Sequence, residues 1–182
     1  MSLKAVDKTQ HQLAEYYRGN GDCERAEMIY KTLLSKACKG QKSMLEKPNH
    51  AEIAALTSGL ANVYTTSQQY DKALPLLKKS VRVNKQVHGN NSHHLTVPYH
   101  NIGEIYRQKK DYDTAEKFLK MSIKNAGQKT LYPGPKNYQG EKDTLLALEN
   151  CYRRRGMHQH ANEAQAAAAA KEQNWTQVPA RS

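Results

Sequence analysis

The sequence between Thr57 and Ile123 decides the fold, because one pattern is written there twice. The first copy reads Leu60-Ala61-x-x-Tyr64 and continues Tyr70-Asp71-x-Ala73-x-x-x-Leu77. The second copy reads Ile102-Gly103-x-x-Tyr106 and continues Tyr112-Asp113-x-Ala115-x-x-x-Leu119, so Ile102 follows Leu60 by 42 residues. Small residues at fixed places let two helices approach closely while bulky neighbours fill the space around them. Each copy therefore predicts a helical hairpin, and the repetition predicts a stack of hairpins.

Two weaker copies flank this pair. The earlier one has Leu13-Ala14-x-x-Tyr17, then a glycine-rich turn that ends in the capping residue Asp22, and then Ala26 in a second helix. The later one restarts at Leu145 and reaches Ala161. The spacing predicts repeats at about 7–40, 50–88, 93–127 and 141–173, a frayed N-terminus over 1–6 and a disordered tail over 174–182.

Prolines and glycines set the expected boundaries. The run from Ala126 to Gly140 is the richest in breakers and predicts a loop between the third and fourth repeats. Pro75 is expected at the end of the first turn of its helix, where backbone N–H groups lack helical partners. Pro98 allows two interpretations: its helix begins with a cap near Thr96, or it is kinked around His94.

The pattern resembles the tetratricopeptide repeat, with Leu77 and Leu119 at the place of its phenylalanine. The long spacing, the segment Tyr70–Ser80 and the sequence Tyr-Arg-Arg-Arg-Gly at 152–156 are similar to the kinesin light chain. This resemblance implies an all-α, right-handed superhelical α-solenoid of about four repeats. It also implies a non-enzymatic adaptor that binds an extended peptide of a partner protein in a concave groove.

Composition narrows the function. The chain has 28 Lys and Arg against 17 Asp and Glu, a net charge of +11, which favours acidic partners. No apolar run approaches the length of a membrane span, and the first residues lack the apolar core of a signal peptide, so we expect a cytoplasmic protein. Three cysteines without a Cys-x-x-Cys pair and scattered histidines argue against disulfides and metal. The sequence predicts no enzyme activity, cofactor or metal.

The groove would be lined by the first helix of each repeat. One position past the tyrosine stands arginine in three repeats, Arg18, Arg107 and Arg153, which an acidic ligand could bind. Asparagine amides offer both a donor and an acceptor to a peptide backbone. The alternative is an ordinary solvated surface in which Arg18 and Arg107 pair with Glu15 and Glu104. The predicted groove residues are Arg18, Asn62, His100, Asn101, Glu104, Arg107, Asn150, Arg153 and Arg154.

Three other functions compete with this one. One is a carboxylate clamp of the kind that tetratricopeptide proteins use for chaperones. Asn62 and Asn101 could fill its two asparagine positions, but Ser58, Asp143 and Ala147 stand where it needs cations. Nucleic-acid binding by the basic surface is the second, weakened by the lack of recurring stacking groups. The third is a self-associating scaffold. The sequence leaves the oligomeric state and the partner open.

Overall fold

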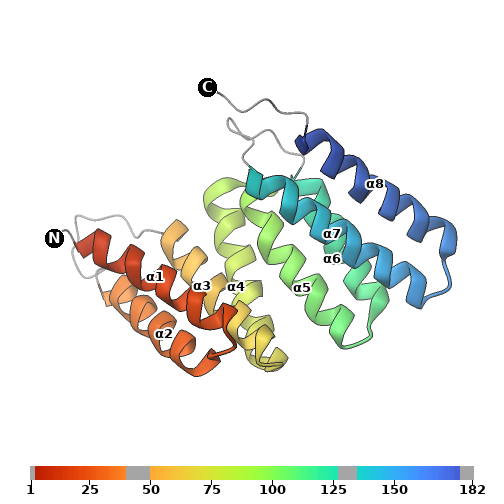
Figure 1. Cartoon of the computed structure of the whole chain (residues 1–182). Helices are drawn as coiled ribbons and strands as arrows, with labels where there is room; N and C mark the ends of the chain where they lie inside the picture. The colour runs from red at the N-terminus through yellow and green to blue at the C-terminus, as the bar shows by residue number, and fades with distance from the viewer. Residues whose placement is uncertain (1–2, 40–49, 127–134, 177–182) are drawn as a thin grey trace. The chain divides into compact units, whose positions relative to one another are not determined.

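The computed structural model describes residues 3–39, 50–126 and 135–176. In these ranges the chain has eight α-helices, one 3-10 helix and no strand, as the repeats predict (Figure 1). It forms two compact units, residues 1–89 and 90–182. The first unit contains α1 (Leu3–Gly19), α2 (Cys23–Lys39), α3 (His50–Thr66) and α4 (Tyr70–His88). The second contains η2 (His93–Leu95), α5 (Thr96–Gln108), α6 (Tyr112–Ala126), α7 (Pro135–Arg154) and α8 (His158–Thr176).

Each hairpin turns in the same way. A backbone hydrogen bond returns to the carbonyl of the pattern tyrosine five residues earlier, from Asp22 to Tyr17 at 2.9 Å and from Asp111 to Tyr106 at 2.9 Å. The residue just before the donor has a positive φ, which glycine adopts without steric cost. These left-handed residues are Gly21 at 80°, Gln68 at 59°, Lys110 at 62° and Gly156 at 73°. Asp22 also caps α2 as expected, accepting the N–H of Arg25 at 3.1 Å.

The small residues of the pattern lie at the closest approaches of the helices. Ala61 and Ala73 are fully buried in the first unit, as is Ala115 in the second. A Cβ atom added to Gly103 would lie 2.7 Å from Cγ of Leu119, so α5 and α6 meet more closely than a side chain there allows. The 42-residue period also appears in hydrogen bonds, since Ser80 donates to the carbonyl of Ala54 and Ser122 to that of Thr96.

Four expected boundaries differ from the structure. α1 begins at Leu3, inside the stretch expected to fray, and α7 begins at Pro135, inside the expected loop, because proline suits the first position of a helix. α8 continues to Thr176; residues 177–182 of the expected tail lie outside the described ranges.

Pro75 is the sixth residue of α4, so the expectation that it ends the first turn was wrong. Pro98 is the third residue of α5, which confirms the interpretation without a kink.

Two of the four pattern tyrosines are buried. Tyr64 and Tyr152 are 6% and 4% exposed, whereas Tyr17 and Tyr106 are half-buried. Tyr152 belongs to the core cluster of the second unit together with Leu119, Leu148 and Cys151. That cluster holds α6, α7 and α8 together and fixes which side of α7 remains exposed.

Candidate functional site

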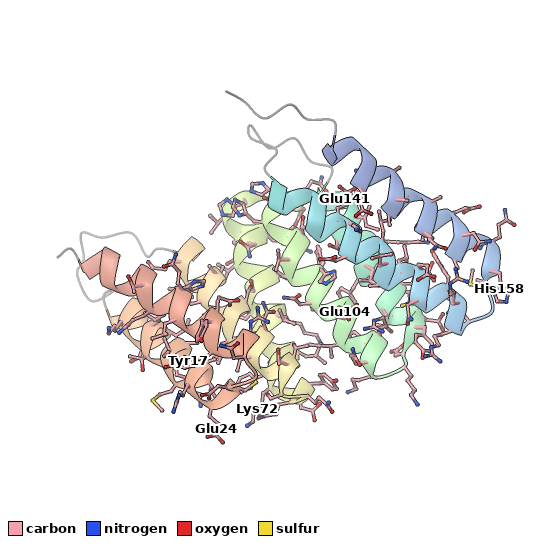
Figure 2. All side chains as sticks on the ribbon, viewed as in Figure 1. Tyr17, Glu24, Lys72, Glu104, Glu141 and His158 are labelled. Atoms are coloured by element: carbon pink, nitrogen blue, oxygen red, sulfur yellow. The ribbon has the colours of Figure 1, made fainter. Side chains whose placement is uncertain are left out.

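Most of the predicted groove residues lie in the second unit, on α5 and α7. These are the first helices of their hairpins, and they contact each other (Figure 1). The partly exposed side of this pair is called here the α5–α7 face, and Glu104, labelled in Figure 2, lies on it. It is formed by His100, Asn101, Glu104, Arg107 and Asn150.

Arg107 is the central group of the α5–α7 face. Its Nη2 lies 2.8 Å from Oε2 of Glu104 and its Nε lies 3.0 Å from Oε1, so the two charges neutralise each other. Its Nη1 donates to Oδ1 of Asn150 on α7 at 3.3 Å. The hydrogen bond to Glu104 raises the pKa of Arg107. Arg107 therefore connects α5 to α7, and Glu104 already neutralises its charge.

His100 makes a second link between α5 and α7. Its Nδ1 lies 2.8 Å from Oγ1 of Thr144, and this hydroxyl donates its single proton to the carbonyl of Gly140 at 2.7 Å. The histidine must then be the donor at Nδ1, which leaves Nε2 of the neutral ring as a hydrogen-bond acceptor. Burial lowers the pKa of His100, against the opposite effect of Glu104 and Asp143, while Arg107 adds to the lowering. The neutral ring is thus favoured at pH 7.

Arg153 and Arg154 lie at the end of α7 and are exposed. Arg153 pairs with Glu149 one turn earlier and donates through Nη2 to Oε1 of Gln165 on α8 at 3.0 Å. Its guanidinium therefore connects the two helices of the fourth hairpin. Arg107 and Arg153 thus have different partners, which are Glu104 and Asn150 for Arg107 and Glu149 and Gln165 for Arg153.

Arg18 and Asn62 belong to the first unit. The guanidinium of Arg18 lies 2.7 Å from Oε2 of Glu15, and Glu15 also accepts a hydrogen bond from the hydroxyl of Tyr30 on α2. Burial would raise the pKa of Glu15, but the hydrogen bonds from Arg18 and Tyr30 hold it below its usual value. Asn62 is half-buried on α3, and its backbone carbonyl accepts a hydrogen bond from the hydroxyl of Thr66 at 3.0 Å. The pairing weighed as the solvated-surface alternative is thus present at Arg18 and at Arg107.

Sequence reasoning missed two residues of this region. Thr144 is fully buried and orients His100, and Glu149 stands at the small-residue position of the fourth repeat, where it pairs with Arg153. The position of Glu149 relative to Tyr152 was visible in the sequence and could have signalled its role. The structure adds no support for the carboxylate clamp at two of its cation positions. Ser58 bonds to Ser80 at 2.9 Å, and Ala147 is 9% exposed within the core cluster.

Comparison with known proteins finds a family model that matches part of the chain. A tetratricopeptide repeat family model matches residues 52–128. Those residues are tetratricopeptide repeats. They span most of α3 and all of α4, α5 and α6, including the doubled pattern around Leu60 and Ile102.

Solved structures extend this likeness of fold over the whole chain. The crystal structure of BtubC (BKLC) from P. vanneervenii has a TM-score of 0.76 at 19% identity, covering 100% of this chain and 70% of that one. A putative kinesin light chain from Podosopora anserina with nearly identical TPR-like repeats has a TM-score of 0.62 at 15% identity, covering 98% of this chain and 100% of that one. The all-α solenoid of tetratricopeptide-like hairpins is thus confirmed, and the likeness to these two structures is one of fold. No curated protein matches the sequence significantly.

None of the described helices is both long and apolar enough to cross a membrane. Within the same residues, histidine, cysteine, aspartate and glutamate side chains nowhere gather in a group of three or more that could hold a metal ion. The repeats indicate a protein–protein interaction module.

Proposed function

We propose that the chain is a non-enzymatic adaptor whose α5–α7 face binds an extended peptide of acidic or mixed sequence from a partner protein. One observation carries this proposal. The contacts between α5 and α7 use one side of each polar group and leave the other side for a ligand. Oδ1 of Asn150 accepts a hydrogen bond from Arg107, and its amide N–H groups remain available to a ligand. His100 donates from Nδ1 to Thr144, and its Nε2 remains available as an acceptor.

An extended peptide suits such a surface, because its backbone presents donors and acceptors along both edges. The groups on α5–α7 are held by their own hydrogen bonds, so little side-chain freedom remains to be lost on binding. Glu104 and Arg107 form a pair that can bind a charged ligand side chain of either sign. This supports a mixed sequence as well as an acidic one.

The net charge of +11 has a separate role in this proposal. Long-range attraction raises the rate at which acidic partners arrive, whereas short-range hydrogen bonds decide how long they stay. Salt should therefore slow association strongly and change dissociation little. This kinetic pattern also separates a peptide groove from general binding of polyanions such as nucleic acid.

The test compares two asparagines of the second unit. Asn150→Ala removes a groove amide, and Asn162→Ala removes an exposed amide from α8. An array of acidic, mixed and basic peptides identifies ligands of the native chain, and their affinities for both variants are then measured. Asn150→Ala should weaken the selected peptides by about fivefold or more, the value of one hydrogen bond, and Asn162→Ala should not.

Two results would contradict the groove. One is an equal effect of both asparagine variants. The other combines two findings. A single-stranded RNA of matched charge displaces the peptide completely, and removing positive charge anywhere on the chain weakens peptide binding equally. The exposed pair Lys78 and Lys79 on α4, changed to Glu, provides that charge control in the first unit. The second outcome would favour the nucleic-acid alternative instead.

A further inference from the structure

The outer side of α1 differs from the equivalent sides of the other first helices. In α3, Leu60 and Val63 are 5% and 0% exposed, and α3 packs on α2. In α7 the residues of the same register, Leu148 and Cys151, are 6% and 0% exposed, and α7 packs on α6. On α1 this register holds Leu13 and Tyr16, which are 42% and 65% exposed. No described helix covers this side of α1.

The two covered junctions share a polar contact as well. The hydroxyl of Tyr64 donates to Oε1 of Glu27 on α2 at 2.9 Å, and the hydroxyl of Tyr152 donates to Oε1 of Glu116 on α6 at 3.1 Å. In both helices the glutamate directly follows the buried alanine of the pattern. Tyr17 occupies the same register in α1, yet among the described residues its hydroxyl has no hydrogen-bond partner.

A cation already stands beside Tyr17. The Arg25 guanidinium lies 5.4 Å from the centre of the Tyr17 ring, as the Lys72 ammonium lies 5.5 Å from that of Tyr64. Figure 2 labels Tyr17 and Lys72, each near the turn of its own hairpin. The side-chain bond from Lys31 lowers the pKa of Glu27 against the effect of burial, and the bond from Tyr64 and the charge of Lys72 add to this lowering. Arg25, which also lies 3.4 Å from Asp22, can act in the same way on an incoming carboxylate.

We propose that the outer side of α1, formed by Leu13, Tyr16 and Tyr17 with Arg25 beside them, binds an amphipathic helix of a partner protein. The covered junctions define that helix. It carries a small residue at the point of closest approach, a glutamate next to it for Tyr17 and Arg25, and apolar residues at helical spacing for Leu13 and Tyr16. This surface is separate from the α5–α7 face and lies on the other unit.

The described helices of a second copy of this chain do not include such a helix. α2 and α6 carry the alanine–glutamate pair, but each already uses it against its own neighbour, α3 or α7. On α8 the equivalent positions hold Asn162 and Gln165, in place of Glu116 and Leu119 on α6. An exposed polar side with only alanines between suits the end of a stack better than a docking helix. The described helices of a second copy thus do not fit this side of α1, and the proposal commits to a helix of a partner protein.

The probe for this proposal is a synthetic peptide with the sequence of α2, residues 23–39, which covers the equivalent side of α3 in the native chain. A covalent staple between the exposed positions of Glu24 and Met28 keeps the peptide helical in solution. Fluorescence anisotropy with the full chain should give saturable binding. Leu13→Ser should weaken it by about tenfold or more, the effect of burying a leucine side chain.

The chain supplies a matched control. Leu146 on α7 is 40% exposed, nearly the same as Leu13, and Leu146→Ser should leave the α2 peptide bound as tightly as before. Both leucines are already exposed, so neither change should alter folding, which far-ultraviolet circular dichroism checks. Equal effects of the two variants, or no saturable binding of the stapled peptide at millimolar concentration, would overturn the proposal.

A double-mutant cycle isolates the polar contact. Tyr17→Phe in the chain and Glu27→Gln in the peptide should each weaken binding, and together they should weaken it by less than the product of the two factors. Independent effects would mean that the peptide does not place its glutamate at Tyr17, and would refute the register. Sedimentation of the chain alone tests the other occupant: a dimer abolished by Leu13→Ser would identify a second copy and overturn the choice of partner.

Discussion

Changing Gly59 to alanine tests how tightly the first two hairpins pack. A Cβ atom at Gly59 on α3 would lie 2.4 Å from both Cε1 and Cζ of Tyr30 on α2 and 2.7 Å from its hydroxyl oxygen. Tyr30 cannot easily move, because it is fully buried and its hydroxyl is bonded to Glu15. Gly59→Ala must therefore push the two helices apart or force the ring from its rotamer.

The magnitude follows from two opposing terms. Overpacking a core by one methyl group costs about 1–3 kcal/mol when the neighbour is rigid. Alanine in place of glycine inside a helix returns about 0.5–1 kcal/mol through the entropy of the unfolded chain. The net expectation is a loss of about 0–2.5 kcal/mol in the free energy of unfolding, with a midpoint of about 1 kcal/mol. Gly140→Ala supplies the control: its Cβ would meet nothing within 4 Å in α7, so only the stabilising term of about 0.5–1 kcal/mol remains.

Urea unfolding followed by circular dichroism measures both variants. The fourth repeat suggests a rescue, because Ala147 and Leu119 stand there at the positions of Gly59 and Tyr30, and both belong to one core cluster. Gly59→Ala should change from destabilising to neutral or stabilising when Tyr30 is also replaced by Leu. If Gly59→Ala stabilised the native chain as Gly140→Ala does, or if its effect were the same in both Tyr30 backgrounds, the packing argument would be wrong.

Three other outcomes are expected. Lys110→Gly should stabilise by about 1 kcal/mol, because Lys110 has a φ of 62°, while Gly21→Ala at 80° should destabilise by a similar amount; thermal melts of both check this. Burial would raise the pKa of Glu116, but bonds from Lys120, Arg155 and Tyr152 hold it below its usual value, so its contribution is complete above the unfolded pKa and is lost as pH falls through the folded one. Glu116→Gln should accordingly flatten the acid limb of the stability curve, and an unchanged limb would contradict this. Tyr64→Ala should cost about 3–5 kcal/mol in urea unfolding, and a loss below about 1 kcal/mol would place the ring outside the core.

The hairpins were predictable because their information is local. An aliphatic residue, a small residue and a tyrosine at fixed spacing specify which sides of two helices meet, whatever lies farther along the chain. Helix ends were less accessible, since α7 gains its first turn from Pro135, which reads in sequence as a breaker. The half-burial of Tyr17 could not be predicted from the sequence either, because it depends on whether another helix covers α1.

The sequence indicated which helices carry the candidate residues, but not the partner that each side chain takes. His100 and Arg107 both lie on α5, and each bonds to a residue of α7, His100 to Thr144 and Arg107 to Asn150. Which partner each arginine takes is a matter of rotamer and distance: Glu104 is one turn from Arg107, and such pairs form readily on any helix. The link from His100 to Thr144 joins residues 44 apart, and nothing local in the sequence indicates it.

The ion pairs change how selectivity should be sought. A ligand carboxylate approaching Arg107 must compete with Glu104, which is held by hydrogen bonds to both Nε and Nη2. Exchanging one carboxylate for another gains little free energy, since both the old and the new pair are partly solvated and worth about 0–1 kcal/mol. Neutral donors and acceptors face no such competition. Asn150 and His100 should therefore discriminate between ligands by the pattern of backbone hydrogen bonds, whereas exposed cations such as Arg154 should influence mainly how fast an acidic ligand arrives.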